Sequence, residues 1–183
     1  MRYAQIRNMD ISNGENLGVS LFVQGCRFQC KNCFNKETWD FDGGKEWTEE
    51  IESKFFELVD RPHIKRISIL GGEPLANENV FDIFNLIQKL KEKFPNKNIW
   101  LYTGYTWNQI FYPILTDDFD LQRDQIINHR KKIIKMCDVV VDGRYVDELK
   151  DLTLKFRGSS NQCLIDVKKT LKENKIILYE GDK

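Results

Sequence analysis

Three of the five cysteines in this 183-residue chain lie within eight residues, at Cys26, Cys30 and Cys33. They follow residues 19–23, a β-branched and aromatic run that is typical of a strand. Thiolates this close together on a polar loop can bind a soft metal centre, and iron–sulfur clusters are held by such thiolates. Three ligands on a four-iron cluster would leave one iron open to a substrate. The Cys-x3-Cys-x2-Cys spacing therefore favours iron–sulfur chemistry at these metal ligands.

Three alternative roles for these cysteines fit the sequence less well. Their spacing also fits a buried helix face, but Gly25, Lys31 and Asn32 disfavour a helix. A structural zinc ion would need a fourth ligand, and the chain has no second close cysteine pair. The residues available for that role are Cys137, Cys163, His63 and His129. Disulfides are disfavoured because the spacings are short and no secretion signal is present. A zinc-stabilised binding module is kept as the alternative from another functional class.

A second motif, Gly71-Gly72-Glu73-Pro74, directly follows an expected strand at residues 64–70. A strand, a glycine turn and a following helix together form a βα unit. Glycines let the main chain approach a ligand closely, and Pro74 restricts Glu73 to an extended conformation. Such a turn is weak evidence by itself. Its position one βα unit after the cysteines makes a shared site a stronger prediction.

Composition predicts one soluble globular domain that spans residues 1–183. Hydrophobic residues make up 41% of the chain and charged residues 31%. The 28 Lys and Arg residues balance 28 Asp and Glu residues, which argues against a nucleic-acid partner. The N-terminus has no apolar leader segment, and no apolar run reaches membrane-spanning length. We therefore expect a cytoplasmic protein with no nucleic-acid or membrane partner.

The alternation of strand and helix patterns predicts an α/β fold with a mostly parallel sheet. Thr48 and Asn77 are expected to cap helices, and Pro113 should end or kink a helix at residues 110–115. Residues 116–132 read as a charged, partly helical excursion whose basic run forms a solvated face rather than a partner contact. Cys137 and Cys163 are expected to be inert, buried thiols. The remaining expected strands are residues 2–11, 98–102, 138–141 and 175–179.

The cysteine spacing after a strand resembles the signature of radical S-adenosylmethionine enzymes. Longer strings are similar to one branch of them, the activating proteins of the anaerobic ribonucleoside-triphosphate reductase. These strings are residues 13–14, 21–26, 33–39, 103–105, 142–145 and 157–162. The resemblance implies an incomplete (βα) barrel of the radical S-adenosylmethionine type. This chain is too short for eight βα units, so the barrel is expected to be open.

The resemblance also implies an activity, cofactors and partners. A 4Fe-4S cluster on Cys26, Cys30 and Cys33 would reductively cleave S-adenosylmethionine to methionine and a 5′-deoxyadenosyl radical. That radical would remove a hydrogen from a glycine of the reductase large subunit and leave a glycyl radical. A low-potential electron donor such as flavodoxin or ferredoxin would supply the electron. No catalytic residues are expected beyond the cluster ligands, because the cofactor carries the chemistry.

Cofactor contacts follow from the same resemblance. Glu73 and main-chain groups of the glycine pair would accept hydrogen bonds from the ammonium of S-adenosylmethionine. Asn32 and Phe34 flank Cys33 and would touch its adenine or methionine part, although many related enzymes have an aromatic residue where Asn32 stands. The full expected set is Asn32, Cys33, Phe34, Gly71, Gly72, Glu73 and Pro74. The turn at Asn13-Gly14 would lie near the mouth of the site. A radical enzyme acting on a small molecule, or on another glycyl-radical enzyme, is the alternative within the superfamily.

Overall fold

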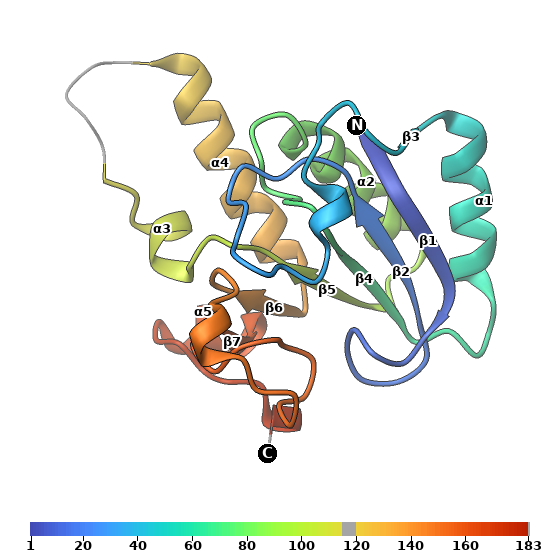
Figure 1. Cartoon of the computed structure of the whole chain (residues 1–183). Coiled ribbons are helices and arrows are strands. Elements are labelled where there is room, and N and C mark those ends of the chain that lie inside the picture. Colours follow the sequence, from blue (N-terminus) through green and yellow to red (C-terminus); the bar gives the residue numbers. More distant parts are fainter. Residues whose placement is uncertain (115–119, 183) are drawn as a thin grey trace.

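The computed structural model describes residues 1–114 and 120–182, which form one sheet with helices around it (Figure 1). The strands are β1 (Arg2–Asp10), β2 (Gly18–Val23), β3 (Lys45–Glu46), β4 (Arg66–Gly71), β5 (Asn98–Tyr102), β6 (Val139–Asp142) and β7 (Cys163–Asp166). The α-helices are α1 (Glu49–Asp60), α2 (Val80–Lys93), α3 (Trp107–Phe111), α4 (Leu121–Met136) and α5 (Val167–Glu173).

The sheet is open, and its strand order is β3-β1-β2-β4-β5-β6-β7. Neighbouring strands from β2 to β6 run parallel, in a register that pairs Val23 with Gly71. The outer strands β1, β3 and β7 pair antiparallel. The predicted α/β class with a parallel sheet centre is therefore confirmed. Parallel strands must be joined by crossovers, which explains the helices that connect β4, β5 and β6.

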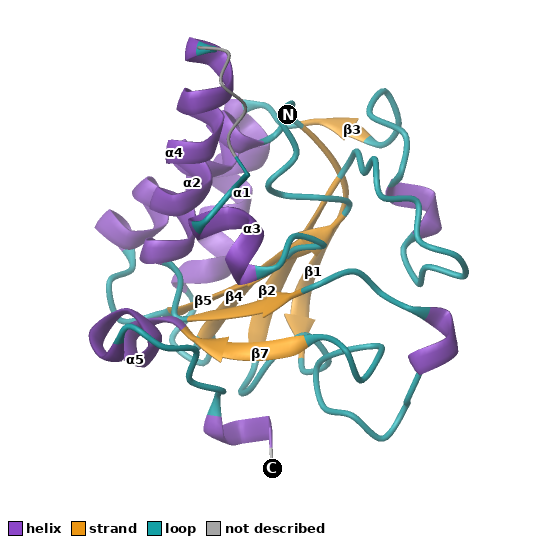
Figure 2. Cartoon of the chain, turned by 90° about the vertical axis from the view of Figure 1, so that its left-hand side faces the viewer, coloured by secondary structure: helices purple, strands orange, loops and turns teal. Residues whose placement is uncertain are grey.

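Helices cover one face of this sheet, and irregular segments cover the other (Figure 2). The main core lies on the helical side, where residues such as Leu21 and Ile69 are fully buried with Ile83 and Ile87 of α2. A smaller apolar cluster on the second face centres on Trp100. Within the described residues, no helix is long and apolar enough to cross a membrane.

Local signals account for several helix ends. The Thr48 side chain accepts a hydrogen bond from the Ile51 main chain and caps α1 as predicted. Thr106 and Gln109 form a capping box on α3, which ends before Pro113. The expected cap at Asn77 is wrong. The residue that precedes α2 is Asn79, whose side chain binds the main-chain oxygens of Gln24 and Glu73 instead.

The C-terminal part differs most from the sequence-based expectation. Residues 163–166 form β7, a strand that was not predicted, and α5 follows it. The strand expected at 175–179 is absent from the described elements, and only an isolated bridge joins Leu178 to Ile165. Cys137 is buried, as expected, at the end of α4. Cys163 is only half-buried at the start of β7, so its expected burial is wrong.

A buried ion pair fixes the turn between β1 and β2. Arg66 and Asp10 are 1% and 4% exposed, and their charged groups lie 3.4 Å apart. Arg66 also donates to the main-chain oxygens of Asp10 (2.6 Å) and Glu15 (3.1 Å). Gly14 of this turn has a φ of 131°, a conformation that favours glycine. The turn is thereby held across the ends of β2 and β4 that lie away from the cysteines. The expectation that the Asn13-Gly14 turn lies near the mouth of the site is therefore wrong.

Replacing Arg66 by leucine is expected to lower the free energy of unfolding by about 3–5 kcal/mol, because it leaves the Asp10 charge buried without its partner. Urea unfolding followed by circular dichroism measures the change. Lys54→Ala is the control, since it removes an exposed pair with Glu50 and should leave stability nearly unchanged. Equal stability of Arg66→Leu and the natural chain would contradict this role.

Candidate metal centre

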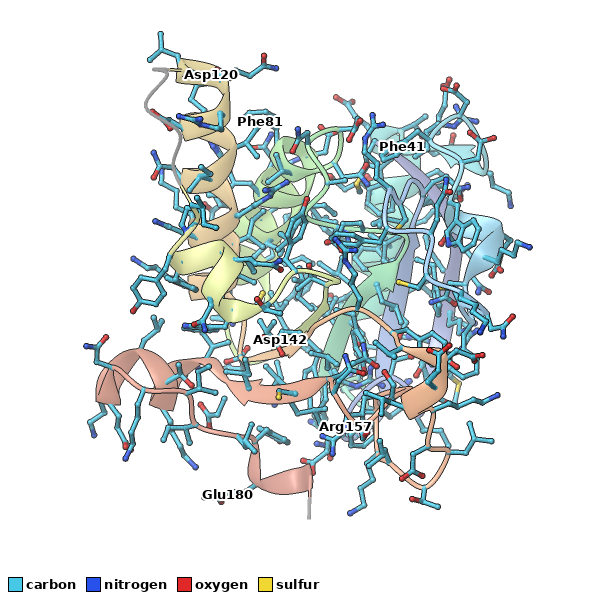
Figure 3. The ribbon with its side chains drawn as sticks, turned by 60° about the vertical axis from the view of Figure 1, so that its left-hand side comes forward. Phe41, Phe81, Asp120, Asp142, Arg157 and Glu180 are labelled. Carbon is cyan, nitrogen blue, oxygen red and sulfur yellow. The ribbon has the colours of Figure 1, made fainter. Side chains whose placement is uncertain are left out.

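The loops that follow the parallel strands meet at one edge of the sheet, because the carboxyl ends of parallel strands share an edge. The cysteine loop (residues 24–39) follows β2, and the glycine loop (residues 71–76) follows β4. Hydrogen bonds link the next two loops, from Thr103 N to Val141 O (3.0 Å) and from Gly143 N to Tyr105 O (3.1 Å). Asp142, labelled in Figure 3, accepts a hydrogen bond from Trp107 N (2.7 Å) and joins β6 to α3. Motifs far apart in the sequence thus surround one site.

The cysteine loop is closed at its base and irregular at its tip. Gly25 N donates to Thr38 O (2.8 Å), and Cys26 N donates to Trp39 O (3.0 Å). At the tip, Gln29 and Asn32 have φ of 46° and 55°, in the left-handed region that a helix does not use. The alternative, in which the three cysteines lie on one buried face of a helix, is therefore wrong.

All five cysteines are free, and the three in the loop are half-buried. Within the described residues, no three His, Cys, Asp or Glu side chains already form a site for a single metal ion. A four-iron cluster needs a wider arrangement, because each thiolate binds a different iron. Three thiols spread over one closed loop are a donor set that fits such a cluster.

Electrostatics link the thiols to their surroundings. Burial raises the pKa of Cys26 to about 11, and the Glu73 carboxylate adds to that rise. Burial, followed by the Cys33 thiol, raises the pKa of Cys30, whereas Arg144 opposes the rise. Thiolates bind metals, so the positive charge of a metal centre would offset these effects and release the protons.

The glycine loop is hydrogen-bonded directly to the base of the cysteine loop. Gly72 N donates to Val23 O (2.9 Å), and Glu73 N donates to Gly25 O (2.7 Å). A Cβ atom at Gly72 would lie 2.5 Å from the Gly25 oxygen, closer than real Cβ contacts come. Glycine at position 72 therefore allows the two main chains to approach, immediately before the first cysteine.

The Glu73 side chain is directed into the protein. It is 2% exposed, and burial raises its pKa to about 6. One carboxylate oxygen accepts hydrogen bonds from Leu75 N (2.9 Å) and Thr103 Oγ1 (2.8 Å), and the other accepts from Gly104 N (2.7 Å). The carboxylate thus ties the loop after β4 to the loop after β5, and Pro74 beside it is also buried.

Replacing Glu73 by glutamine is expected to lower the free energy of unfolding by about 1–3 kcal/mol, because an amide NH2 must then face a buried N–H or O–H donor. Urea unfolding measures this change. Glu78→Gln is the matched control in the neighbouring turn, since Glu78 is exposed and bonded only at the surface to Arg27. The tie between the two loops would be disproved if both variants were as stable as the natural chain.

Asn32 and Phe34 contact a C-terminal segment that sequence analysis did not assign to the site. Asn32 Nδ2 donates to Asp147 Oδ2 (2.6 Å). The Phe34 ring lies 5.1 Å from the Tyr145 ring, centre to centre, and is 56% exposed. The string 142–145 was noted as a resembling motif, but no local pattern predicted its contact with the cysteine loop.

Phe28, in the middle of the cysteine loop, is held by aromatic and cationic neighbours. Its ring packs edge-to-face on Tyr105, with centroids 4.9 Å apart. The Arg144 guanidinium lies 4.3 Å from the centre of the Phe28 ring. A Cβ atom at Gly104 would come within 2.4 Å of this ring, so the glycine makes room for it. Sequence reasoning gave Phe28 no role, because nothing local marks it.

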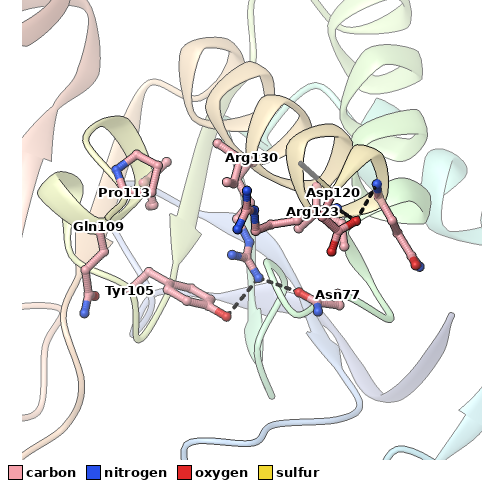
Figure 4. Close-up of a pocket in the computed structure, with 11 residues that line it drawn as sticks. Asn77, Tyr105, Gln109, Pro113, Asp120, Arg123 and Arg130 are labelled. Atoms are coloured by element: carbon pink, nitrogen blue, oxygen red, sulfur yellow. Dashed lines mark hydrogen bonds between the residues drawn. The ribbon is translucent and has the colours of Figure 1, made fainter. Parts of the chain in front are cut away.

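Arg130 of α4 reaches the same edge (Figure 4). It donates to Leu75 O (2.8 Å), Asn77 Oδ1 (2.8 Å) and Tyr105 OH (2.9 Å). Asn77, Tyr105 and Arg130 are among the residues that line a cavity of about 480 Å³ between α3, α4 and the loops. The prediction of a purely solvated basic run is therefore wrong at Arg130. Residues 115–119, which include part of the predicted excursion, lie outside the described residues.

Comparison with known families agrees with this arrangement. Residues 12–165 match a family model described as a 4Fe-4S single cluster domain, which places the chain among iron–sulfur proteins. That match spans the cysteine loop, the glycine loop and all of β7 except Asp166.

The chain belongs to the family of anaerobic ribonucleoside-triphosphate reductase-activating proteins. It is 40% identical over 166 residues to the protein of that name from Salmonella typhi, covering 90% of this chain and 97% of that protein. Identity to the Escherichia coli K12 protein is 36%, with the same coverage. Identity to the bacteriophage T4 protein is 32% over 164 residues, covering 90% of this chain and 93% of that protein.

Proposed function

We propose that this protein is a radical S-adenosylmethionine enzyme that generates a glycyl radical on the anaerobic ribonucleoside-triphosphate reductase. The observation that carries the proposal is the direct hydrogen bonding between the cysteine loop and the glycine loop at the carboxyl edge of the sheet. A ligand bound across these two loops would contact a cluster on the cysteine loop and, at the same time, the main chain of the glycine loop. The names of the related proteins support the identity of the reductase as the partner.

Cys26, Cys30 and Cys33 would hold the cluster through their sulfur atoms, leaving one iron without a protein ligand. The chemistry that such a cluster would supply, once bound and reduced, is the transfer of one electron to the sulfonium of S-adenosylmethionine, which would break the bond to C5′ and give methionine and a 5′-deoxyadenosyl radical. The protein contributes binding, orientation and the exclusion of water. A low-potential donor, such as flavodoxin or ferredoxin, would restore the electron.

The glycine loop would bind the amino end of S-adenosylmethionine mainly through its main chain. A Cβ at Gly71 would meet Phe22, and one at Gly72 would meet the Gly25 oxygen, so glycine at both positions lets this loop lie directly against the strand and loop that carry the cysteines. The carbonyl oxygens of the two glycines would accept hydrogen bonds from the ammonium. Glu73 and Pro74 would act chiefly by holding this loop in place, because both carboxylate oxygens of Glu73 already accept protein hydrogen bonds. Asn32 and Phe34 would border the ligand where the cysteine loop meets residues 144–150.

The open sheet fits an incomplete (βα) barrel in one domain spanning residues 1–183. Its parallel centre carries helices on one face, as the outer layer of a barrel would. An open side would admit a loop of a large protein, which suits a glycine on another polypeptide. We place the enzyme in the cytoplasm, where thiols are kept reduced.

The test is to mix the iron-loaded protein, a chemical reductant and S-adenosylmethionine with the anaerobic reductase in the absence of oxygen. The expected result is a glycyl-radical signal in electron paramagnetic resonance spectra of the reductase. Omitting S-adenosylmethionine should abolish it. Formation of 5′-deoxyadenosine without a glycyl radical would instead indicate a radical enzyme with another substrate.

A further inference from the structure

A C-terminal segment, residues 144–148, lies along residues 28–32 of the cysteine loop. Contacts join Arg144 to Phe28, Asp147 to Asn32 and Glu148 to Lys31. This segment therefore supplies much of the immediate electrostatic surroundings of the middle cysteine.

Arg144 is fixed in this position from two sides. Its guanidinium lies 4.3 Å from the Phe28 ring centre, and Phe28 is itself packed against Tyr105. Its main-chain oxygen accepts a hydrogen bond from Asn161 Nδ2 (2.8 Å). A cation on an aromatic face gains stabilisation, so the guanidinium is held over the loop between Cys26 and Cys30.

The acidic residues of the segment are paired with neighbouring polar and basic groups. Glu148 forms an ion pair with Lys31 (3.0 Å). Asp147 accepts hydrogen bonds from Asn32 (2.6 Å) and Tyr145 OH (2.8 Å). Arg144 is the cation of this segment that lies over the cysteine loop, at Phe28, which is two residues from both Cys26 and Cys30.

We propose that Arg144 is a positioning residue whose cation, held on Phe28, makes the cluster on the cysteine loop easier to reduce. This inference rests on the proposed function, because it requires the cluster. Reduction adds one negative charge to the cluster, and a nearby fixed cation stabilises the more negative state. Net charge and hydrogen bonds around the sulfurs are among the factors that set the potentials of iron–sulfur centres.

The expected effect of Arg144 on the midpoint potential of the cluster is moderate, because Arg144 is exposed to solvent and its charge is screened. Arg144→Gln should lower the ratio of reduced to oxidised cluster about tenfold at a fixed potential, which for one electron is a shift of about 59 mV toward more negative values. Arg144→Lys keeps the charge and should recover most of the natural midpoint.

The experiment is an anaerobic redox titration of the reconstituted protein without S-adenosylmethionine, monitored by electron paramagnetic resonance. Lys93→Gln is the matched control: Lys93 is also a cation on a phenylalanine ring, 4.9 Å from Phe56, but it ends α2 at the opposite edge of the sheet. Its midpoint should equal that of the natural protein. Equal midpoints for Arg144→Gln and the natural protein would overturn the proposal.

Two further results distinguish a failure of the proposed function from a failure of the inference about Arg144. If the natural protein takes up no iron, the proposed function fails, and with it this inference. If only Arg144→Gln fails to take up iron, Asp147→Asn tests the same electrostatics with the opposite sign. Loss of that negative charge should move the midpoint upward, and an unchanged or lower midpoint would overturn the proposal.

Discussion

Replacing Cys30 by alanine is expected to remove the cluster and the activity together. Cys30 is the middle thiol of a loop whose base is fixed by two main-chain hydrogen bonds, so no neighbouring cysteine can take its place without opening the loop. Iron after anaerobic reconstitution should fall from about four atoms per chain to a small fraction of that. Colorimetric iron and sulfide analysis and the visible absorption spectrum measure the loss.

Cys137→Ala is the control for the effect of losing a thiol. Cys137 is buried at the end of α4, where its sulfur donates only to the Ile133 main chain (3.3 Å). This variant should be slightly less stable and bind as much iron as the natural protein. Full iron content and undiminished cleavage of S-adenosylmethionine in Cys30→Ala would show that Cys30 is not a ligand.

Replacing Gly72 by alanine is expected to weaken the binding of S-adenosylmethionine about tenfold or more. The new Cβ would stand 2.5 Å from the Gly25 oxygen, so the glycine loop and the cysteine loop must move apart. Overpacking of this kind typically costs about 1–3 kcal/mol, and here the displaced main chain would line the ligand site. Anaerobic calorimetric titration of the iron-loaded protein with S-adenosylmethionine measures the affinity.

Gly143→Ala separates loop displacement from general backbone strain. Gly143 has a φ of 94°, so alanine is strained there, yet its Cβ would meet no atom nearer than 3.8 Å. That variant should be destabilised but should keep most of its affinity. If Gly72→Ala binds S-adenosylmethionine as tightly as the natural protein and carries equal iron, the glycine loop does not form the ligand site.

Sequence patterns predicted the elements that place the site. Residues 19–23 and 64–70 were correctly predicted as strands, and the structure pairs them in parallel, so that the two following loops share an edge. Cys26, Cys30 and Cys33 could be proposed as metal ligands from the sequence, because metal ligands often cluster locally along a chain. The Thr48 cap and the end of α3 before Pro113 also follow from signals within a few residues of each helix end.

The remaining features depend on contacts between distant residues, for which a single sequence has no local pattern. Arg130 stands in a charged run that looks solvated, yet it binds the glycine loop 55 residues earlier. The contact of Asp147 with Asn32 spans 115 residues. β7 is only four residues long, and its pairing with β6 defines it better than its composition does. The residue that precedes α2 is Asn79 and not Asn77. The side-chain amide of Asn79 is buried, where it donates to the main-chain oxygens of Gln24 and Glu73.

The most direct test of the account is formation of 5′-deoxyadenosine by the reconstituted, reduced protein in the presence of S-adenosylmethionine. We expect a brown protein whose product formation depends on each of Cys26, Cys30 and Cys33, while Cys137→Ala forms product normally. A colourless protein with one tightly bound zinc ion per chain and no 5′-deoxyadenosine would contradict it and indicate a zinc-stabilised binding module.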